Sequence, residues 1–203
     1  MSRGRQSKKR ALKRNIYIFT EGETEKNYFS ILNKKYNSTA TVKVSVSHAH
    51  KQGMQLLRHA LGKINTLNKT DKSNIGGVYI IFDKDDIDTN EIQNVLKEAK
   101  KQGIHIGFSN SCFEVWLLAH FEKLNKSHTK QRLYKRLEYH LDCKQYSRRH
   151  KNDQELLEKI EDLVFTAMEN TATMEDLSQI TINCEPYTNI GKMIQCIYDR
   201  DIY

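Results

Sequence analysis

Long hydrophobic runs are absent from this 203-residue chain. A membrane-spanning helix needs roughly 20 consecutive apolar residues, and no run approaches that length. The charged N-terminal residues are not followed by an apolar segment of signal-peptide length either. These absences predict a cytoplasmic protein that makes no membrane contact.

Cysteine pairs and prolines are also scarce. The four cysteines, Cys112, Cys143, Cys184 and Cys196, are widely spaced and form no Cys-x-x-Cys pair. This spacing argues against a zinc knuckle or a dithiol redox site, so we expect reduced and mostly buried thiols. The single proline, Pro186, is expected to interrupt the chain just before its last helix.

Negative charge is in the minority, with 25 Asp and Glu against 33 Lys and Arg and a formal net charge of +8. Much of the excess lies in residues 1–14, which we expect to form a disordered basic arm. A positive excess favours a polyanionic partner such as nucleic acid. The alternative is that the arm is only a solvated tail.

What the chain does contain is a regular alternation of apolar patterns. These patterns predict four strands, at residues 15–20, 41–47, 78–82 and 104–108. Helical spacing predicts helices at residues 23–36, 53–67, 90–102, 112–124, 128–142, 153–170 and 188–200.

Strands that alternate with helices indicate an α/β fold, here a Rossmann-like parallel four-stranded sheet flanked by helices. We divide the chain into the arm (residues 1–14), an α/β core (residues 15–124) and a C-terminal helical extension packed on it (residues 125–203).

Acidic side chains follow two of the predicted strands: Glu21 comes after the first, and Asp83, Asp85 and Asp86 come after the third. Parallel sheets bind ligands beyond the carboxyl ends of their strands, above all where the strand order reverses. In a 2-1-3-4 order, Glu21, Asp83 and Asp85 would converge on one crevice. Their repulsion would favour a bound cation. Mg²⁺ or Mn²⁺ suits such hard oxygen ligands.

A purely structural interpretation of the same acidic turn stays open. Thr20 and Glu23 have the spacing of a capping box. Glu23 and Glu25 lie in a first helical turn, where the helix dipole favours negative charge. We therefore expect Glu23 and Glu25 to start the helix and Glu21 to face the crevice.

Four segments of the chain together resemble the RloB family: "FTEGETEKNYF", "IIFDKDD", "SNSCFEVWLLAHF" and "EPYTNIGKMI". A strand that ends in Glu-Gly-Glu, followed some sixty residues later by one that ends in Asp-x-Asp, also resembles a Toprim domain, the metal-dependent fold of topoisomerases, bacterial primases and OLD-type nucleases. The resemblance spans residues 16 to about 200. Two positions depart from the family pattern: Ser111 replaces the usual proline, and Glu185 replaces the usual asparagine.

The resemblance implies a Toprim-like metal site in which Glu21 is a ligand or general base and Asp83 and Asp85 are Mg²⁺ ligands. At the same site, it implies that Asp86 is a candidate ligand of a second metal ion. It also implies a role in phage defence by abortive infection, beside a separately encoded ABC-type ATPase. We therefore expect a metal-dependent nuclease that cuts RNA or DNA. The alternative is a non-catalytic regulatory subunit of the same system that binds nucleic acid or nucleotide.

Further polar residues are candidates for substrate contact. Ser109, Asn110 and Glu114 follow the fourth strand on the same rim, where backbone N–H groups at a helix start could bind phosphate. Lys26 could reach a phosphate from the first helix. His48, at the end of the second strand, is a minor candidate.

The segment 123–151 mixes cations with tyrosines, a combination that suits single-stranded nucleic acid, because cations neutralise phosphates and exposed tyrosines stack on bases. The alternative is a helix with an apolar core face and solvated charges. The candidate binding residues are Lys130, Arg132, Arg136, Arg148 and Arg149.

Overall fold

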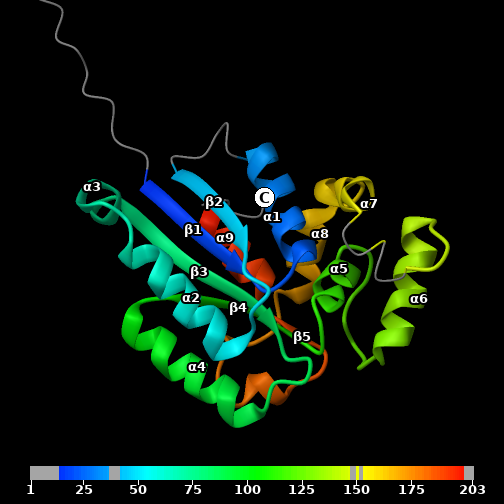
Figure 1. Ribbon diagram of the computed structural model, residues 1–203. Coiled ribbons are helices and arrows are strands. Elements are labelled where there is room, and N and C mark those ends of the chain that lie inside the picture. Colours follow the sequence, from blue (N-terminus) through cyan, green and yellow to red (C-terminus); the bar gives the residue numbers. More distant parts are fainter. Residues whose placement is uncertain (1–13, 37–41, 147–149, 151–152, 199–203) are drawn as a thin grey trace, which may run out of the picture.

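The computed structural model describes residues 14–36, 42–146, 150 and 153–198, so the predicted basic arm lies outside the described residues except for Arg14. One sheet contains five strands in the order β2-β1-β3-β4-β5 (Figure 1). The strands are β1 (Arg14–Thr20), β2 (Val42–His48), β3 (Ile75–Asp83), β4 (His105–Asn110) and β5 (Tyr187–Thr188). The first four are parallel, and β5 runs antiparallel to β4.

The order expected for the first four strands is confirmed, but the prediction of a four-stranded, all-parallel sheet is wrong. The fold is α/β with a mixed sheet. The added strand, β5, has only two residues, too few to show an alternating pattern in the sequence.

Side-chain hydrogen bonds from Asn189 extend this short strand. The Asn189 Oδ1 accepts from the backbone N–H of Phe108 at 2.7 Å, and its Nδ2 donates to the Ile106 carbonyl at 2.8 Å. The amide thus occupies two backbone groups at the outer edge of β4. It also fixes the start of the last helix, which begins at Ile190.

Nine α-helices are present among the described residues: α1 (Glu23–Tyr36), α2 (Gly53–Asn65), α3 (Lys69–Ser73), α4 (Thr89–Gln102), α5 (Glu114–Ala119), α6 (Lys130–Leu141), α7 (Gln154–Glu158), α8 (Val164–Thr171) and α9 (Ile190–Tyr198). Two 3₁₀ turns, η1 (Glu161–Leu163) and η2 (Thr181–Asn183), complete the described structure. Among these helices, none is long and apolar enough to cross a membrane.

Two predicted helices differ from the structure. The segment 112–124 is helical only over Glu114–Ala119, and 153–170 breaks into α7, η1 and α8. Every side chain from Cys112 to His120 is buried, so that segment has no polar face from which helix length could be read. In the second segment, Leu157, Ile160 and Val164 are all buried, and their helical spacing continues across the break.

The two faces of the sheet carry separate hydrophobic clusters. On one face, α2 and α4 cover alternate residues of the strands, such as Phe19 of β1 and Ile80 of β3 (Figure 1). On the other face, Ile18 and Ile81 pack with α1, α5, α6, α8 and α9 in one continuous cluster. The helices after residue 125 therefore share a core with the first helix.

The cysteines are unpaired, as expected, but they are not mostly buried. Cys112 is buried and Cys143 is half-buried, whereas Cys184 and Cys196 are exposed.

Replacing Asn189 with alanine should destabilise the fold by about 2–3 kcal/mol, because the change leaves two backbone groups of β4 without partners. Urea unfolding, followed by circular dichroism, measures this loss. The matched control, Asn125→Ala at an exposed loop position, should change stability by less than about 0.5 kcal/mol. Equal effects of the two substitutions would contradict the role given to the Asn189 amide.

Candidate functional site

The pairing of β1 with β3 brings the two predicted acidic segments together. Thr20 lies opposite Ile81, and the Glu21 N–H donates to the Ile81 carbonyl at 3.0 Å. The Glu21 carboxylate turns toward β3, with its Oε2 3.5 Å from the backbone N of Asp83. Glu21 and Asp83 thus meet at the carboxyl ends of two neighbouring strands.

Asp83 is the most constrained of these carboxylates. It is buried at the end of β3, and its Oδ2 accepts from the Phe113 N–H at 2.8 Å. Its Oδ1 is buried and has no hydrogen-bond partner among the described residues. Burial, reinforced by the negative charges of Glu25, Glu114 and other nearby carboxylates, raises the pKa of Asp83 well above its ordinary value.

Glu25 joins the same group from the first turn of α1. Its side chain is buried, and its Oε2 has no hydrogen-bond partner among the described residues. Burial, together with the charges of Glu114 and Glu21, raises the pKa of Glu25 to about 7. A Cβ at Gly22 would lie 2.9 Å from that Oε2, so a larger residue in the turn before α1 would displace this carboxylate.

Glu25 was expected only to start the helix, and the structure gives it a second place, in the buried acidic group. It does lie in the first turn of α1, but it also belongs to the buried acidic group. Helical spacing could have identified it, because Glu25 precedes the buried Tyr28 and Phe29 by three and four residues and so shares their face. Glu23, by contrast, is exposed, and its Oε1 lies 3.9 Å from Nε2 of His48.

Glu21 is less buried than Asp83 and lies at the margin of the group. Burial raises its pKa to about 7; the N–H of Asp83 acts in the opposite direction, and the charge of Asp85 adds to the increase. A carboxyl group with a pKa near neutrality can take up or release a proton at physiological pH.

Asp85 has a different partner from the one expected. Its backbone adopts a left-handed conformation with φ of 32°, and its N–H donates to the Ser111 carbonyl at 3.0 Å. The carboxylate forms an ion pair with Lys130, at the start of α6. Asp86 follows in the same turn and is exposed.

The carboxylates of this group are not arranged around a common metal position. Among the described residues, no three His, Cys, Asp or Glu side chains are arranged so that they could hold a metal ion. The charges that shift the pKa of Asp83 act over several ångströms, whereas Mg²⁺ requires oxygens at about 2.1 Å. The donor set of carboxylates, with one buried unpartnered oxygen on Asp83, still fits a hard divalent cation.

The candidates that follow β4 have structural partners. Ser109 and Asn110 are buried; the Ser109 hydroxyl lies 3.1 Å from that of Thr188, and the Asn110 amide donates to the Cys184 carbonyl at 2.8 Å. Their side chains hold β5 and the segment before it. Glu114 is buried at the start of α5, and its charge contributes to the raised pKa of Asp83.

Other predicted contacts lie around the rim. His48 is half-buried, and its ring lies 4.5 Å from the ring of His50, centroid to centroid. Lys26 is half-buried on α1.

Helix α6 presents only part of its predicted cationic face. Arg136 pairs with Glu122, whereas Arg132 is exposed. Partial burial lowers the pKa of Lys130, but the carboxylate of Asp85 outweighs it, so the pKa lies above its ordinary value.

The tyrosines of this region divide into two kinds. Tyr139 is 82% exposed and could stack on a base, whereas Tyr146 is 3% exposed and belongs to the core, so it cannot stack on a base. Arg148 and Arg149 lie outside the described residues.

Fold and site together define an α/β protein with a buried carboxylate group at the carboxyl ends of parallel strands. A family model described as "RloB-like protein" matches residues 16–197, and the chain belongs to this family. No curated protein matches the chain, and no solved structure does.

The acidic group should make the metal-free protein less stable as the pH rises. With a pKa raised from 4.5 to about 7, Glu25 binds its proton more tightly in the folded than in the unfolded state. The corresponding stability is present below pH 4.5 and is lost as the pH rises through about 7, at a cost on the order of 3 kcal/mol. Asp83 acts in the same direction. Glu25→Gln should flatten the decline, measured by urea unfolding with a chelator present.

The measurement runs from about pH 4.5 to pH 8, and the difference between Glu25→Gln and the wild type isolates Glu25, because the opposite effect of His120 is common to both proteins. Burial lowers the pKa of His120 to about 4, so its contribution is present above pH 6.5 and is lost as the pH falls. Glu158→Gln, an exposed matched control, should keep the wild-type decline. A decline that Glu25→Gln leaves unchanged would contradict the assignment.

Proposed function

We propose that this chain is a Mg²⁺- or Mn²⁺-dependent, Toprim-like nuclease that hydrolyses phosphodiester bonds of RNA or DNA. The observation that carries the proposal is Asp83, which is buried at the end of β3 among like charges with one oxygen unpartnered. Such a group is costly unless a proton or a cation neutralises it. Its place beyond the carboxyl ends of parallel strands is where α/β sheets bind ligands.

Each carboxylate has a distinct part in this proposal. Asp83 is held by the Phe113 N–H, so its free oxygen has a fixed direction. Glu21 lies beside it and serves as a ligand or as the general base toward water, with Asp85 and Asp86 as further ligands. A bound divalent ion would supply the charge that activates water and stabilises the leaving oxygen.

The ion pair between Asp85 and Lys130 links the acidic edge to α6. Asp85 would exchange this partner when it serves as a ligand. Lys130 would then be left beside the site, where an ammonium group suits a substrate phosphate.

Arg132 and Tyr139 are exposed on the outer side of α6, away from Lys130, where they would hold a strand that passes over the helix, one through a phosphate and one through a base. The role in phage defence and the control by an ABC-type ATPase are supported by membership of the RloB-like family and by the motif resemblance.

A second function has two observations in its favour. Within the described residues, no three potential ligands are grouped for a metal, and Lys130 already neutralises Asp85. This arrangement would suit a non-catalytic subunit that binds nucleic acid or nucleotide and regulates the same system.

Asp83→Asn should lower the cleavage rate by about 100-fold or more, because the site loses a charge that holds the metal. Asparagine can still accept from the Phe113 N–H, so the fold should be retained. The assay follows labelled RNA and DNA with Mg²⁺ or Mn²⁺, with and without the neighbouring ATPase.

Two results of this assay would contradict the proposal, one for the metal site and one for the activity. Cleavage that persists unchanged in Asp83→Asn would rule out the metal site at Asp83, with Glu158→Gln as the matched exposed control. Tight nucleic-acid binding by the wild type, with no cleavage under any condition, would favour the regulatory subunit.

Nucleic-acid binding should depend on α6. In the Asp83→Asn background, which keeps the substrate intact, Tyr139→Ala should weaken single-strand affinity by about tenfold through loss of base stacking. Arg132→Ala should make the plot of log affinity against log salt concentration less steep by about one unit, which corresponds to the loss of one phosphate contact. Fluorescence anisotropy at several salt concentrations measures both. Lys34→Ala, exposed on α1, should change neither, and equal losses at Lys34 would show non-specific attraction.

A further inference from the structure

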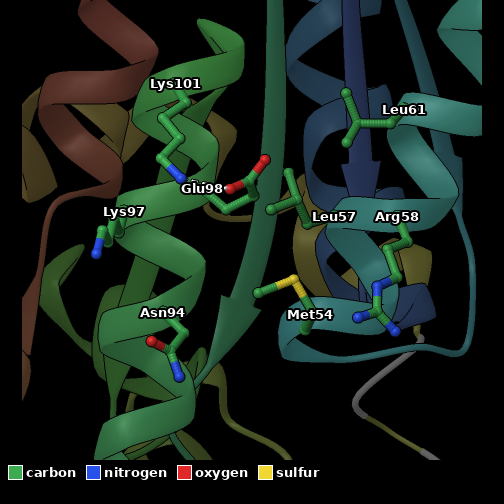
Figure 2. A pocket seen from close by; sticks show the side chains of 8 residues that line it. All are labelled: Met54, Leu57, Arg58, Leu61, Asn94, Lys97, Glu98 and Lys101. Atoms are coloured by element: carbon green, nitrogen blue, oxygen red, sulfur yellow. Dashed lines mark hydrogen bonds and ion pairs between the residues drawn. The ribbon is translucent and has the colours of Figure 1, made fainter.

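A groove runs between α2 and α4, on the sheet face opposite α1 and α5. It has a volume of about 460 Å³, and the two helices that form it lie side by side (Figures 1 and 2). Met54, Leu57 and Leu61 of α2 supply its apolar side, at spacings of three and four residues. Lys97 and Lys101, one turn apart on α4, supply its cationic side.

The charge of the groove is positive. Arg58 adds a third cation, at the outer margin of α2, and Glu98 supplies the single carboxylate among the lining residues (Figure 2). Glu98 is already engaged, because its oxygens accept from Lys101 at 3.3 Å and from Gln102 at 3.0 Å. Among the described residues, Lys97 and Arg58 form no ion pair, and both are exposed.

One end of the groove is fixed before anything binds. The side chain of Gln52 does not cap α2; instead the Oε1 of Glu91, on α4, accepts from the Met54 N–H at 3.3 Å. Gly53 has a φ of 51°, and a Cβ there would lie 2.6 Å from the same Oε1. The first turns of α2 and α4 are thus held together, so a ligand would meet a largely preformed surface.

We propose that this groove binds an acidic amphipathic helix of a partner protein. The α2 wall repeats at helical spacing over about two turns, and Asn94 extends the α4 wall of Lys97 and Lys101 to a similar length, which matches the side-chain rows of a third helix. The apolar edge of that helix would lie on the half-buried Met54 and Leu61, above the fully buried Leu57, and its acidic edge would face Lys97 and Lys101. Methionine at the entrance adapts readily to the shape of such a partner. The inference holds whether or not the chain cuts nucleic acid.

Nucleic acid fits this groove less well than it fits α6. One wall is apolar, and the carboxylate of Glu98 lies inside, whereas a phosphate backbone needs an unbroken row of cations. The apolar wall and the cationic wall of the groove instead match a helix that has an apolar edge beside an acidic edge.

The test uses the full chain and a fluorescent synthetic peptide of four helical turns, with leucines at helical spacing on one edge and glutamates beside them. Fluorescence anisotropy should show binding, and Lys97→Glu with Lys101→Glu should weaken it at least about tenfold through like-charge repulsion. The matched control, Lys34→Glu with Lys63→Glu, changes net charge equally at exposed positions outside the groove and should bind as the wild type does. A peptide with lysines in place of the glutamates should prefer the Lys97→Glu, Lys101→Glu variant to the wild type.

A second readout locates the peptide. Amide chemical shifts should change along α2 and α4, and Leu61→Asp should weaken binding while circular dichroism stays unchanged. Four results would overturn the proposal: no peptide binding, equal loss in both charge-reversed variants, displacement of the peptide by single-stranded nucleic acid, or self-association that Lys97→Glu with Lys101→Glu abolishes. The last would make a second copy of the chain the occupant.

Discussion

The parallel pairing of β1 with β3 is the constraint on which the acidic site depends. It sets Glu21 beside Asp83, although 62 positions separate them in the chain. Both strands are covered on both faces, so a register slip would move core side chains such as Ile18 into the opposite cluster. The hydrophobic core therefore fixes the relative height of the two strand ends, and with it the distance between the carboxylates.

The buried acidic group lowers the stability of the folded protein, and the hydrophobic core compensates for this loss. Asp83 and Glu25 each bury an oxygen without a partner among the described residues, a rare situation in a folded protein. Such groups are retained at sites where a proton or a ligand supplies the missing interaction. The same cost is the reason that the site and the stability of the protein respond to pH together.

Much of the fold could be predicted from the sequence, because the four long strands and α1, α2 and α4 have clear apolar periodicity. The order of these strands places Glu21 near Asp83, and the motif spacing indicated both residues. Two features could not be predicted in the same way. β5 depends on the side chain of Asn189, a contact between distant segments, and the pairing of Asp85 with Lys130 depends on how α6 packs. The burial of Glu25 could have been predicted from helical spacing, but its place in the first turn of α1 favoured the interpretation that it only starts the helix.

The amide of Asn189 also has a consequence for solubility. An open strand edge presents backbone groups that can recruit another chain, and proteins avoid aggregation by blocking such edges. On the outer side of β4, one amide satisfies the N–H of Phe108 and the carbonyl of Ile106, and β5 covers the rest of the strand's carboxyl end. The side chain of Asn189 thus blocks this part of the β4 edge from pairing with another chain. Without it, a full neighbouring strand would be needed to cover the same backbone groups.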